Sequence, residues 1–269
     1  MDAKPHFLEH QGMVVSYVKA GNGPVPLLAF HGFGQDHSAF ANLFNPLGGR
    51  FTIYSFDLFF HGQSHWPERE VPLSKKFWKS LLLAFIKKNH LFRFSLMGYS
   101  LGAKFALATL EAIPERILSV YFLAPDGIQT NFWYKLATYP AGSRKIFKGL
   151  IDSPGLFQFL ASSAIRLNLL DKSMVRFAQS QMDTAEKRKR VYYAWTVFRH
   201  LKFDMEHIAY LINMLKIQTT VIVGQHDKII TLENTQKLLK ELNNYQLEIL
   251  QTGHNGLIDE SLSVWDKIK

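Results

Sequence analysis

Short apolar runs alternate with longer amphipathic segments along most of this chain, and that alternation limits the folds open to it. The strand-like runs are bounded by turn signals and cover residues 14–18, 26–30, 52–57, 94–97, 120–124, 220–223 and 247–250. The helical patterns between them cover residues 74–88, 101–112, 232–242 and 257–268. Strands and helices in this order are typical of an α/β domain with a mostly parallel central sheet flanked by helices. The glycine-rich turn at 20–24 predicts a hairpin between the first two runs.

Residues 127–210 interrupt the alternation, because they contain helical patterns and loop signals but no strand-like run. We interpret this segment as an inserted helical cap or lid, with residues 1–126 and 211–269 forming the core. Its aromatic residues are expected to pack the insertion, with one or two facing a pocket; among them are Trp133, Tyr139, Phe157, Phe159, Trp195 and Phe198.

The same segment holds most of the chain's positive charge. It carries 13 Lys and Arg against six Asp and Glu, so +7 of the formal +9 lies there. The excess either attracts an anionic substrate or belongs to a solvated helix face. Contact with an acidic membrane surface is a weaker alternative, and no nucleic-acid partner is expected, because no recognition module accompanies the charges.

Composition excludes several kinds of chemistry. The 269 residues contain no cysteine, which excludes disulfides, iron–sulfur clusters, cysteine zinc ligands and a cysteine nucleophile. No phosphate-binding or dinucleotide-binding glycine motif occurs, so no dinucleotide cofactor is expected. The expected reaction requires no metal or other organic cofactor either. The first residues lack an apolar signal segment and the run at 81–86 is too short to span a bilayer, so we expect a soluble, cytoplasmic protein. The sequence does not indicate an oligomeric state.

One motif carries the chemistry. Gly98-Tyr99-Ser100-Leu101-Gly102 follows a strand-like run and precedes a helical one. A sharp strand-to-helix bend needs small residues on both sides and lifts the serine hydroxyl above the sheet. The start of the helix also offers N–H groups to an oxyanion. Ser100 is therefore the candidate nucleophile.

A serine nucleophile needs a base and an orienting acid. His254 and Asp227 each follow a predicted strand, which gives the chain order Ser100, Asp227, His254. Asp126 also follows a strand and is the alternative acid. Asp227 is preferred, because its turn comes one strand before His254.

These motifs resemble those of the α/β-hydrolase superfamily, in particular its capped esterase or lipase-like branch with a serine nucleophile. The resemblance includes His31-Gly32-Phe33-Gly34 and the segment from Asp57 to Ser64, in which Phe59 and Phe60 replace the family's usual Pro and Gly. It implies an oxyanion hole formed by the backbone N–H groups of Phe33 and Leu101.

The resemblance also suggests roles for neighbouring residues. It implies that Asp57 is a structural loop anchor. His31 and His61 lie beside glycines and are expected to organise the backbone. Lys104, four residues after the nucleophile, is expected to be exposed to solvent.

The reaction implied is cleavage of a carboxylic ester or thioester through an acyl-enzyme intermediate. The same triad could instead serve a menaquinone-precursor lyase, a carbon–carbon bond hydrolase or a cofactor-free perhydrolase. An interfacial lipase and a non-catalytic ligand receptor are further alternatives. The substrate is expected to be a small acyl compound, and its acyl length is open.

Overall fold

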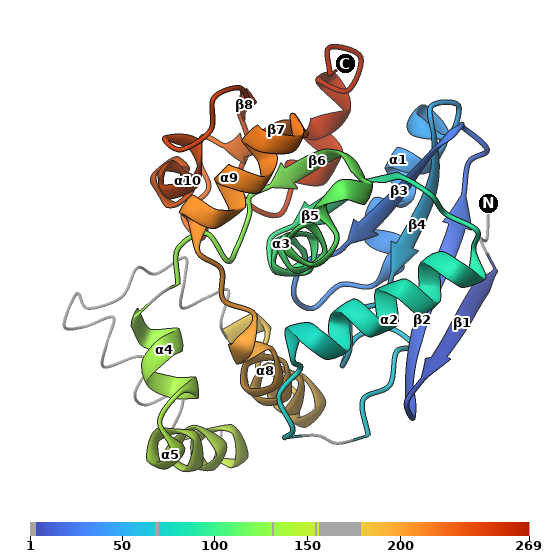
Figure 1. Cartoon of the computed structure of the whole chain (residues 1–269). Helices are drawn as coiled ribbons and strands as arrows, with labels where there is room; N and C mark the ends of the chain where they lie inside the picture. The colour runs from blue at the N-terminus through green and yellow to red at the C-terminus, as the bar shows by residue number, and fades with distance from the viewer. Residues whose placement is uncertain (1–3, 68–69, 131, 154, 156–178, 269) are drawn as a thin grey trace. The chain divides into compact units, whose positions relative to one another are not determined.

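Eight strands form one sheet in the order β1-β2-β4-β3-β5-β6-β7-β8 in the computed structural model (Figure 1). The structure describes residues 4–67, 70–130, 132–153, 155 and 179–268, except the side chain of residue 133. The strands are β1 Pro5–His10, β2 Met13–Ala20, β3 Val25–Phe30, β4 Phe51–Phe56, β5 Phe94–Tyr99, β6 Ile117–Leu123, β7 Gln218–Gly224 and β8 Gln246–Leu250. Strands β3 to β8 pair in parallel, whereas β1 and β2 are antiparallel to their neighbours. The predicted α/β class with a mostly parallel sheet is confirmed.

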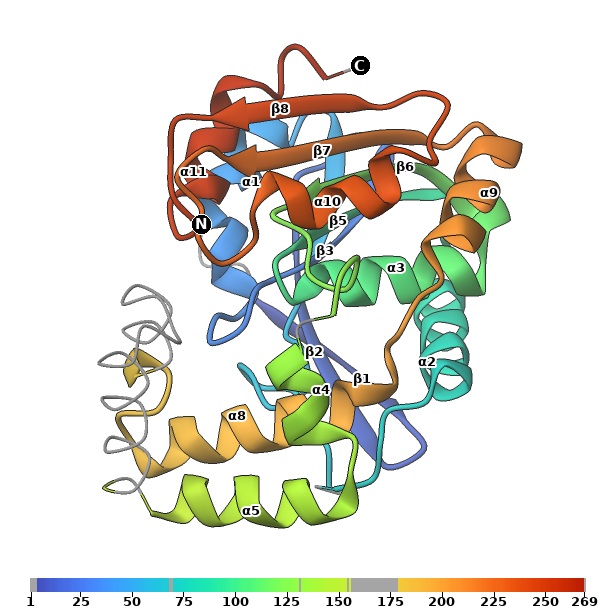
Figure 2. The same ribbon diagram turned by 90° about the vertical axis from the view of Figure 1, so that its left-hand side faces the viewer.

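Helices cover both faces of this sheet (Figure 2). They are α1 Ala41–Leu47, α2 Lys75–Lys88, α3 Gly102–Ala112, α9 Met205–Leu215, α10 Leu232–Leu239 and α11 Leu257–Glu260. Helices α1 and α11 share one buried core with β3, β5 and β6. Helices α2 and α3 lie on the other face, where Trp78 and Phe105 pack edge to face at 5.0 Å. No helix among the described residues is both long and apolar enough to cross a membrane.

Local sequence explains where helix α2 begins and which face it buries. The Ser74 hydroxyl accepts a hydrogen bond from the Phe77 N–H at 3.1 Å and so caps the helix. Trp78, Leu81 and Phe85 recur at helical spacing and are buried. The helix ends after Lys87 and Lys88, where positive charge complements the helix dipole.

Two expectations about local structure were wrong. Strands β2 and β3 do not form a hairpin, because β4 lies between them in the sheet. The hairpin lies earlier, between β1 and β2, where Gln11 and Gly12 have φ angles of 50° and 79°. A two-residue turn with both φ angles positive matches the twist of antiparallel strands. The helical pattern at 257–268 gives only the short α11 and a 3-10 turn at Ser261–Ser263.

The chain divides into two compact units. The first comprises residues 1–67, 73–129 and 201–269, and the second comprises residues 68–72 and 130–200. Helix α9 belongs to the first unit, because its buried face, which includes Ile208 and Ile212, packs against α3 and α10. Residues 201–210 of the expected 127–210 insertion therefore lie with the sheet.

The second unit contains helices α4 Phe132–Thr138, α5 Ala141–Asp152 and α8 Ala185–Val197. Its aromatic side chains pack on one another: Trp195 lies 5.2 Å from Tyr134 and 5.6 Å from Phe147, between ring centroids. The Tyr134 hydroxyl also donates a hydrogen bond to the Trp195 carbonyl oxygen at 3.1 Å. These contacts agree with the expected packing role of the aromatic residues. The Trp133 side chain, Phe157 and Phe159 lie outside the described residues.

Candidate active site

Ser100 lies at the bend between β5 and α3, with a φ angle of 49°. A residue with a side chain rarely adopts this left-handed conformation, so the surroundings must hold it. The Ser100 N–H donates to the Leu123 carbonyl oxygen at 2.9 Å, and the Ser100 carbonyl oxygen accepts from the Ala103 and Asp126 N–H groups at 3.0 and 3.1 Å. Hydrogen bonds to β6, to the loop after it and to α3 therefore fix the bend.

The two glycines of the motif are required by close approach. A Cβ atom on Gly98 would lie 2.6 Å from the Ala103 Cα atom, and one on Gly102 would overlap the carbonyl oxygen of Phe30. Contacts this short with backbone atoms cannot be relieved by a side-chain rotation. The motif thus allows α3 to start directly against β3 and β5.

The structure brings Ser100, His254 and Asp227 together. His254 Nε2 lies 3.0 Å from Ser100 Oγ, and His254 Nδ1 lies 2.6 Å from Asp227 Oδ2. Because a carboxylate can only accept, Nδ1 carries the proton, and Nε2 can accept the proton of the Ser100 hydroxyl that lies against it. Asp227 and His254 are 5% and 8% exposed, so water screens their interaction little.

The loops that carry the acid and the base are held by further hydrogen bonds. Asp227 Oδ1 accepts the Ile229 and Ile230 N–H groups at 2.8 and 2.9 Å, which leaves Oδ2 for the imidazole. The Tyr99 hydroxyl donates to the carbonyl oxygen of His254 at 2.7 Å. Burial, and secondarily the charge of Asp227, raises the pKa of Tyr99, so this hydroxyl remains a donor.

Asp126, the alternative acid, has a different partner. Lys104 Nζ lies 2.9 Å from Asp126 Oδ2, and the two side chains are 6% and 29% exposed. The expectation that Lys104 is exposed was wrong. The chain folds back over the lysine at Gly127, where a Cβ atom would lie 2.8 Å from Lys104 Cγ.

Phe33 lies in the loop after β3. Leu101 is the N-cap residue of helix α3. Neither backbone N–H group donates a hydrogen bond to any atom of the described residues. An N–H group without a hydrogen-bond partner can act as a donor to a developing negative charge, so the structure is compatible with the oxyanion hole that the sequence resemblance implies.

His31, His61 and Asp57 organise the loops, as expected. His31 is fully buried; its Nδ1–H donates to the Gly32 carbonyl oxygen at 2.6 Å, and its Nε2 accepts the Leu58 N–H at 3.0 Å. Burial lowers the pKa of His31 to about 4, so the ring is neutral and can accept that bond. His61 Nδ1–H donates to the Phe59 carbonyl oxygen at 3.0 Å.

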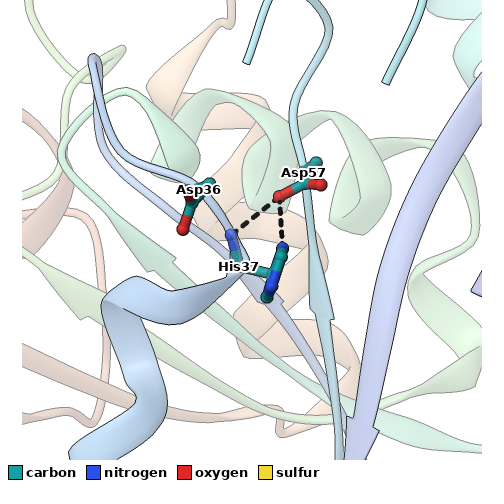
Figure 3. Close-up of side chains that lie close together, drawn as sticks. All are labelled: Asp36, His37 and Asp57. Carbon is teal, nitrogen blue, oxygen red and sulfur yellow. Dashed lines mark hydrogen bonds and ion pairs between the residues drawn. The ribbon is translucent and has the colours of Figure 1, made fainter. Parts of the chain in front are cut away.

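Asp36, His37 and Asp57 form a cluster of groups that could ligate a metal ion (Figure 3). Their atoms are already engaged, however. Asp57 Oδ1 accepts both the backbone N–H and the Nδ1–H of His37, at 2.7 and 2.9 Å. Asp36 Oδ1 accepts the N–H and hydroxyl groups of Ser38, at 2.9 and 2.6 Å. Each of the three side chains therefore has at least one hydrogen-bond partner within the protein.

Sequence reasoning missed Tyr99 and His37 as residues that fix the site. Tyr99 occupies a position of the serine motif that tolerates any residue, and its partner is a backbone atom 155 positions away. His37 lies 20 residues before Asp57 with no spacing signal between them. Only the fold brings these groups into contact.

Comparison with known proteins identifies the family. Residues 25–261 match the family model described as "alpha/beta hydrolase fold". The chain is 27% identical over 148 residues to the dihydrolipoyllysine-residue acetyltransferase component of the acetoin cleaving system of Cupriavidus necator. That match covers 54% of this chain but only 39% of the relative.

Solved structures of known hydrolases share the fold. A thermophilic esterase from Thermogutta terrifontis has a TM-score of 0.70 at 18% identity, covering 99% of this chain and 97% of that one. The thioesterase domain of the curacin biosynthetic pathway has a TM-score of 0.65 at 17% identity, covering 100% and 99%. At these identities the likeness concerns the fold. The family model spans most of the chain, and the chain therefore belongs to the α/β-hydrolase fold family.

Proposed function

We propose that this chain is a serine hydrolase that cleaves a carboxylic ester or a thioester through an acyl-enzyme intermediate. The observation that carries the proposal is the continuous hydrogen-bonded series from Ser100 Oγ through His254 to Asp227. The family and the shared folds of an esterase and a thioesterase support the same reaction class.

In the acylation step, Ser100 Oγ attacks the acyl carbonyl while His254 Nε2 accepts its proton. Asp227 stabilises the imidazolium that forms and keeps the ring in the required tautomer. His254 then transfers the proton to the departing alcohol or thiol. The acyl group remains on Ser100.

The Phe33 and Leu101 N–H groups stabilise the negative oxygen of the tetrahedral intermediate. Loss of one such donor typically costs about 100- to 1000-fold in kcat, so this term is a large part of the rate enhancement. In deacylation, His254 removes a proton from water, which attacks the acyl-enzyme by the same route. The carboxylic acid product leaves and Ser100 is regenerated.

Labelling with a fluorophosphonate, together with turnover of p-nitrophenyl esters, tests the proposal. We expect stoichiometric labelling of Ser100 and steady ester turnover, both abolished in Ser100→Ala. Labelling without turnover would favour a non-catalytic receptor. A wild-type protein that is not labelled at Ser100 would overturn the proposal.

A matched series of esters and thioesters can determine the substrate class. Oxygen esters and thioesters with the same acyl groups compare the two leaving groups, and acyl chains of increasing length separate a small-ester enzyme from a lipase. Neutral and carboxylate-bearing acyl groups at low and high salt test whether the positive charge of residues 127–210 matters. If that charge attracts substrate, kcat/KM for the anionic series falls with salt while the neutral series is unchanged.

A further inference from the structure

The loop from Gly32 to Asp36 is fixed on both sides of Phe33. On the N-terminal side, the Gly32 N–H donates to Gln35 Oε1 at 2.9 Å, and the Gly32 carbonyl oxygen accepts His31 Nδ1–H. On the C-terminal side, the loop enters the 3-10 helix η1 His37–Phe40, whose first residue is bonded to Asp57. Phe33 lies between these two attachments.

The C-terminal attachment is a side-chain clasp, which we define as His37 and Asp57 (Figure 3). Asp57 directly follows β4, its side chain is fully buried, and its Oδ2 accepts the Gln63 N–H at 2.9 Å. Its Oδ1 receives two donors from His37, one from the backbone and one from the ring. The clasp therefore joins the loop after β3 to the loop after β4.

The His37 side chain is partly buried, with 25% of it exposed. A second tie already joins the two loops, since His31 Nε2 accepts the Leu58 N–H. The ring bond to Asp57 is therefore not needed to hold the loops together. At the far end of the short segment that contains Phe33, the ring bond adds to two backbone attachments: the His37 N–H donates to Asp57, and the His37 carbonyl oxygen accepts the Ser55 hydroxyl at 2.9 Å.

We infer that His37, acting through Asp57, is a positioning residue that holds the Phe33 N–H in place as an oxyanion donor. The inference rests on the proposed function, and it concerns a donor without a partner among the described residues, in a loop whose Gly32 and Gln35 N–H groups are bonded. Such a donor stabilises a transition state without reorganisation only if its surroundings are rigid. A misplacement of about 1 Å can cost on the order of 100-fold in rate.

The asparagine and alanine variants of His37 separate this role from general packing. Asparagine places an N–H donor close to the position of imidazole Nδ1, so His37→Asn keeps the side-chain bond to Asp57, whereas His37→Ala leaves only the backbone N–H bond. His10 provides a matched control, because it is another partly buried histidine whose ring is hydrogen-bonded, to the Ser80 hydroxyl at 2.9 Å.

The experiment measures the rate constant of Ser100 phosphonylation by a fluorophosphonate, with kcat and KM for a p-nitrophenyl ester. We expect His37→Ala to lower the phosphonylation rate and kcat about tenfold, with KM within twofold of wild type. His37→Asn and His10→Ala should stay within about twofold of wild type in every parameter. The pH profile of kcat/KM should keep its shape in all three variants, because His254 and Asp227 are untouched.

The outcomes distinguish the inference from the proposed function. If wild-type protein is neither labelled nor active, the proposed function fails and the inference fails with it. If wild type is active but His37→Ala matches it, or His37→Asn is as slow as His37→Ala, the positioning role is overturned while the serine hydrolase stands. A rise in KM without loss of kcat would instead make His37 a substrate contact and would equally overturn it.

Discussion

Asp227 and Asp126 each follow a strand of the sheet, and only the former is bonded to the His254 ring. We predict that Asp227→Asn lowers kcat by about 1000- to 10,000-fold, because an amide presents an N–H to the ring or holds the wrong tautomer. Asp126→Asn should lower kcat by less than about tenfold. Steady-state ester hydrolysis measures both. Equal losses in the two variants would contradict the assignment of the acid.

His31 links stability to pH, because burial lowers its pKa from 6.5 to about 4. Below pH 6.5 the unfolded chain binds a proton at this ring while the folded chain does not, so stability falls as the pH drops from 6.5 towards 4. The difference of about 2.5 units corresponds to roughly 3 kcal/mol across that window.

Replacing His31 by glutamine tests this linkage. The amide oxygen of the new side chain can accept the Leu58 N–H but does not titrate. We expect His31→Gln to be less stable at pH 7 yet to lose less stability than wild type between pH 6.5 and 4.5. Urea unfolding at several pH values measures the slope. Parallel slopes for the two proteins would show that His31 does not carry the effect.

At the scale of elements, the start of helix α3 depends on backbone contact with β3. Gly102→Ala places a methyl group on the Phe30 carbonyl oxygen, so we expect a loss of more than about 3 kcal/mol or failure to fold. Gly149→Ala, in the middle of helix α5 with nothing near its Cβ position, should instead gain about 0.5 to 1 kcal/mol. Chemical denaturation measures the free energy of unfolding of both variants. A harmless Gly102→Ala would mean that α3 can move off the sheet.

At the scale of the whole molecule, the two compact units should open separately. Trp195→Ala removes the ring that joins Tyr134 and Phe147, so we expect faster amide hydrogen exchange in α4, α5 and α8. Strands β3 to β7 should keep wild-type protection. Hydrogen-exchange mass spectrometry resolves the segments, and Val221→Ala, in the buried strand β7, should show the reverse pattern. Uniformly faster exchange in Trp195→Ala would indicate one cooperative unit.

The sequence was sufficient for features that consecutive residues determine. The serine bend needs glycines two residues before and two residues after Ser100, and the parallel sheet follows from alternating strands and helices, so both could be read locally. The positions of Asp227 and His254 were predictable because each directly follows a strand and the ends of parallel strands meet at one edge.

Contacts between distant segments could not be predicted. Strand β2 pairs with β4, which comes later in the chain than β3, and nothing in the local sequence indicates this. The turn at Gln11 and Gly12 gives no strong hairpin signal, because its first position is not asparagine. A lysine is normally exposed. Lys104 is buried because Asp126, in the loop after β6, forms an ion pair with it. The clasp of His37 and Asp57 could not be predicted either, because it joins two segments 20 residues apart that only the fold brings together.

Two of the proposed catalytic residues differ in their place in the sheet, one following a central strand and the other an edge strand. Ser100 follows β5, which has strands on both sides, whereas His254 follows β8, which pairs only with β7 within the described sheet and is partly exposed along its length. On warming we therefore expect fraying to begin near the proposed general base and not near the proposed nucleophile. Heat inactivation should accordingly precede the melting of the sheet, and brief cooling should restore turnover without refolding from a denatured chain.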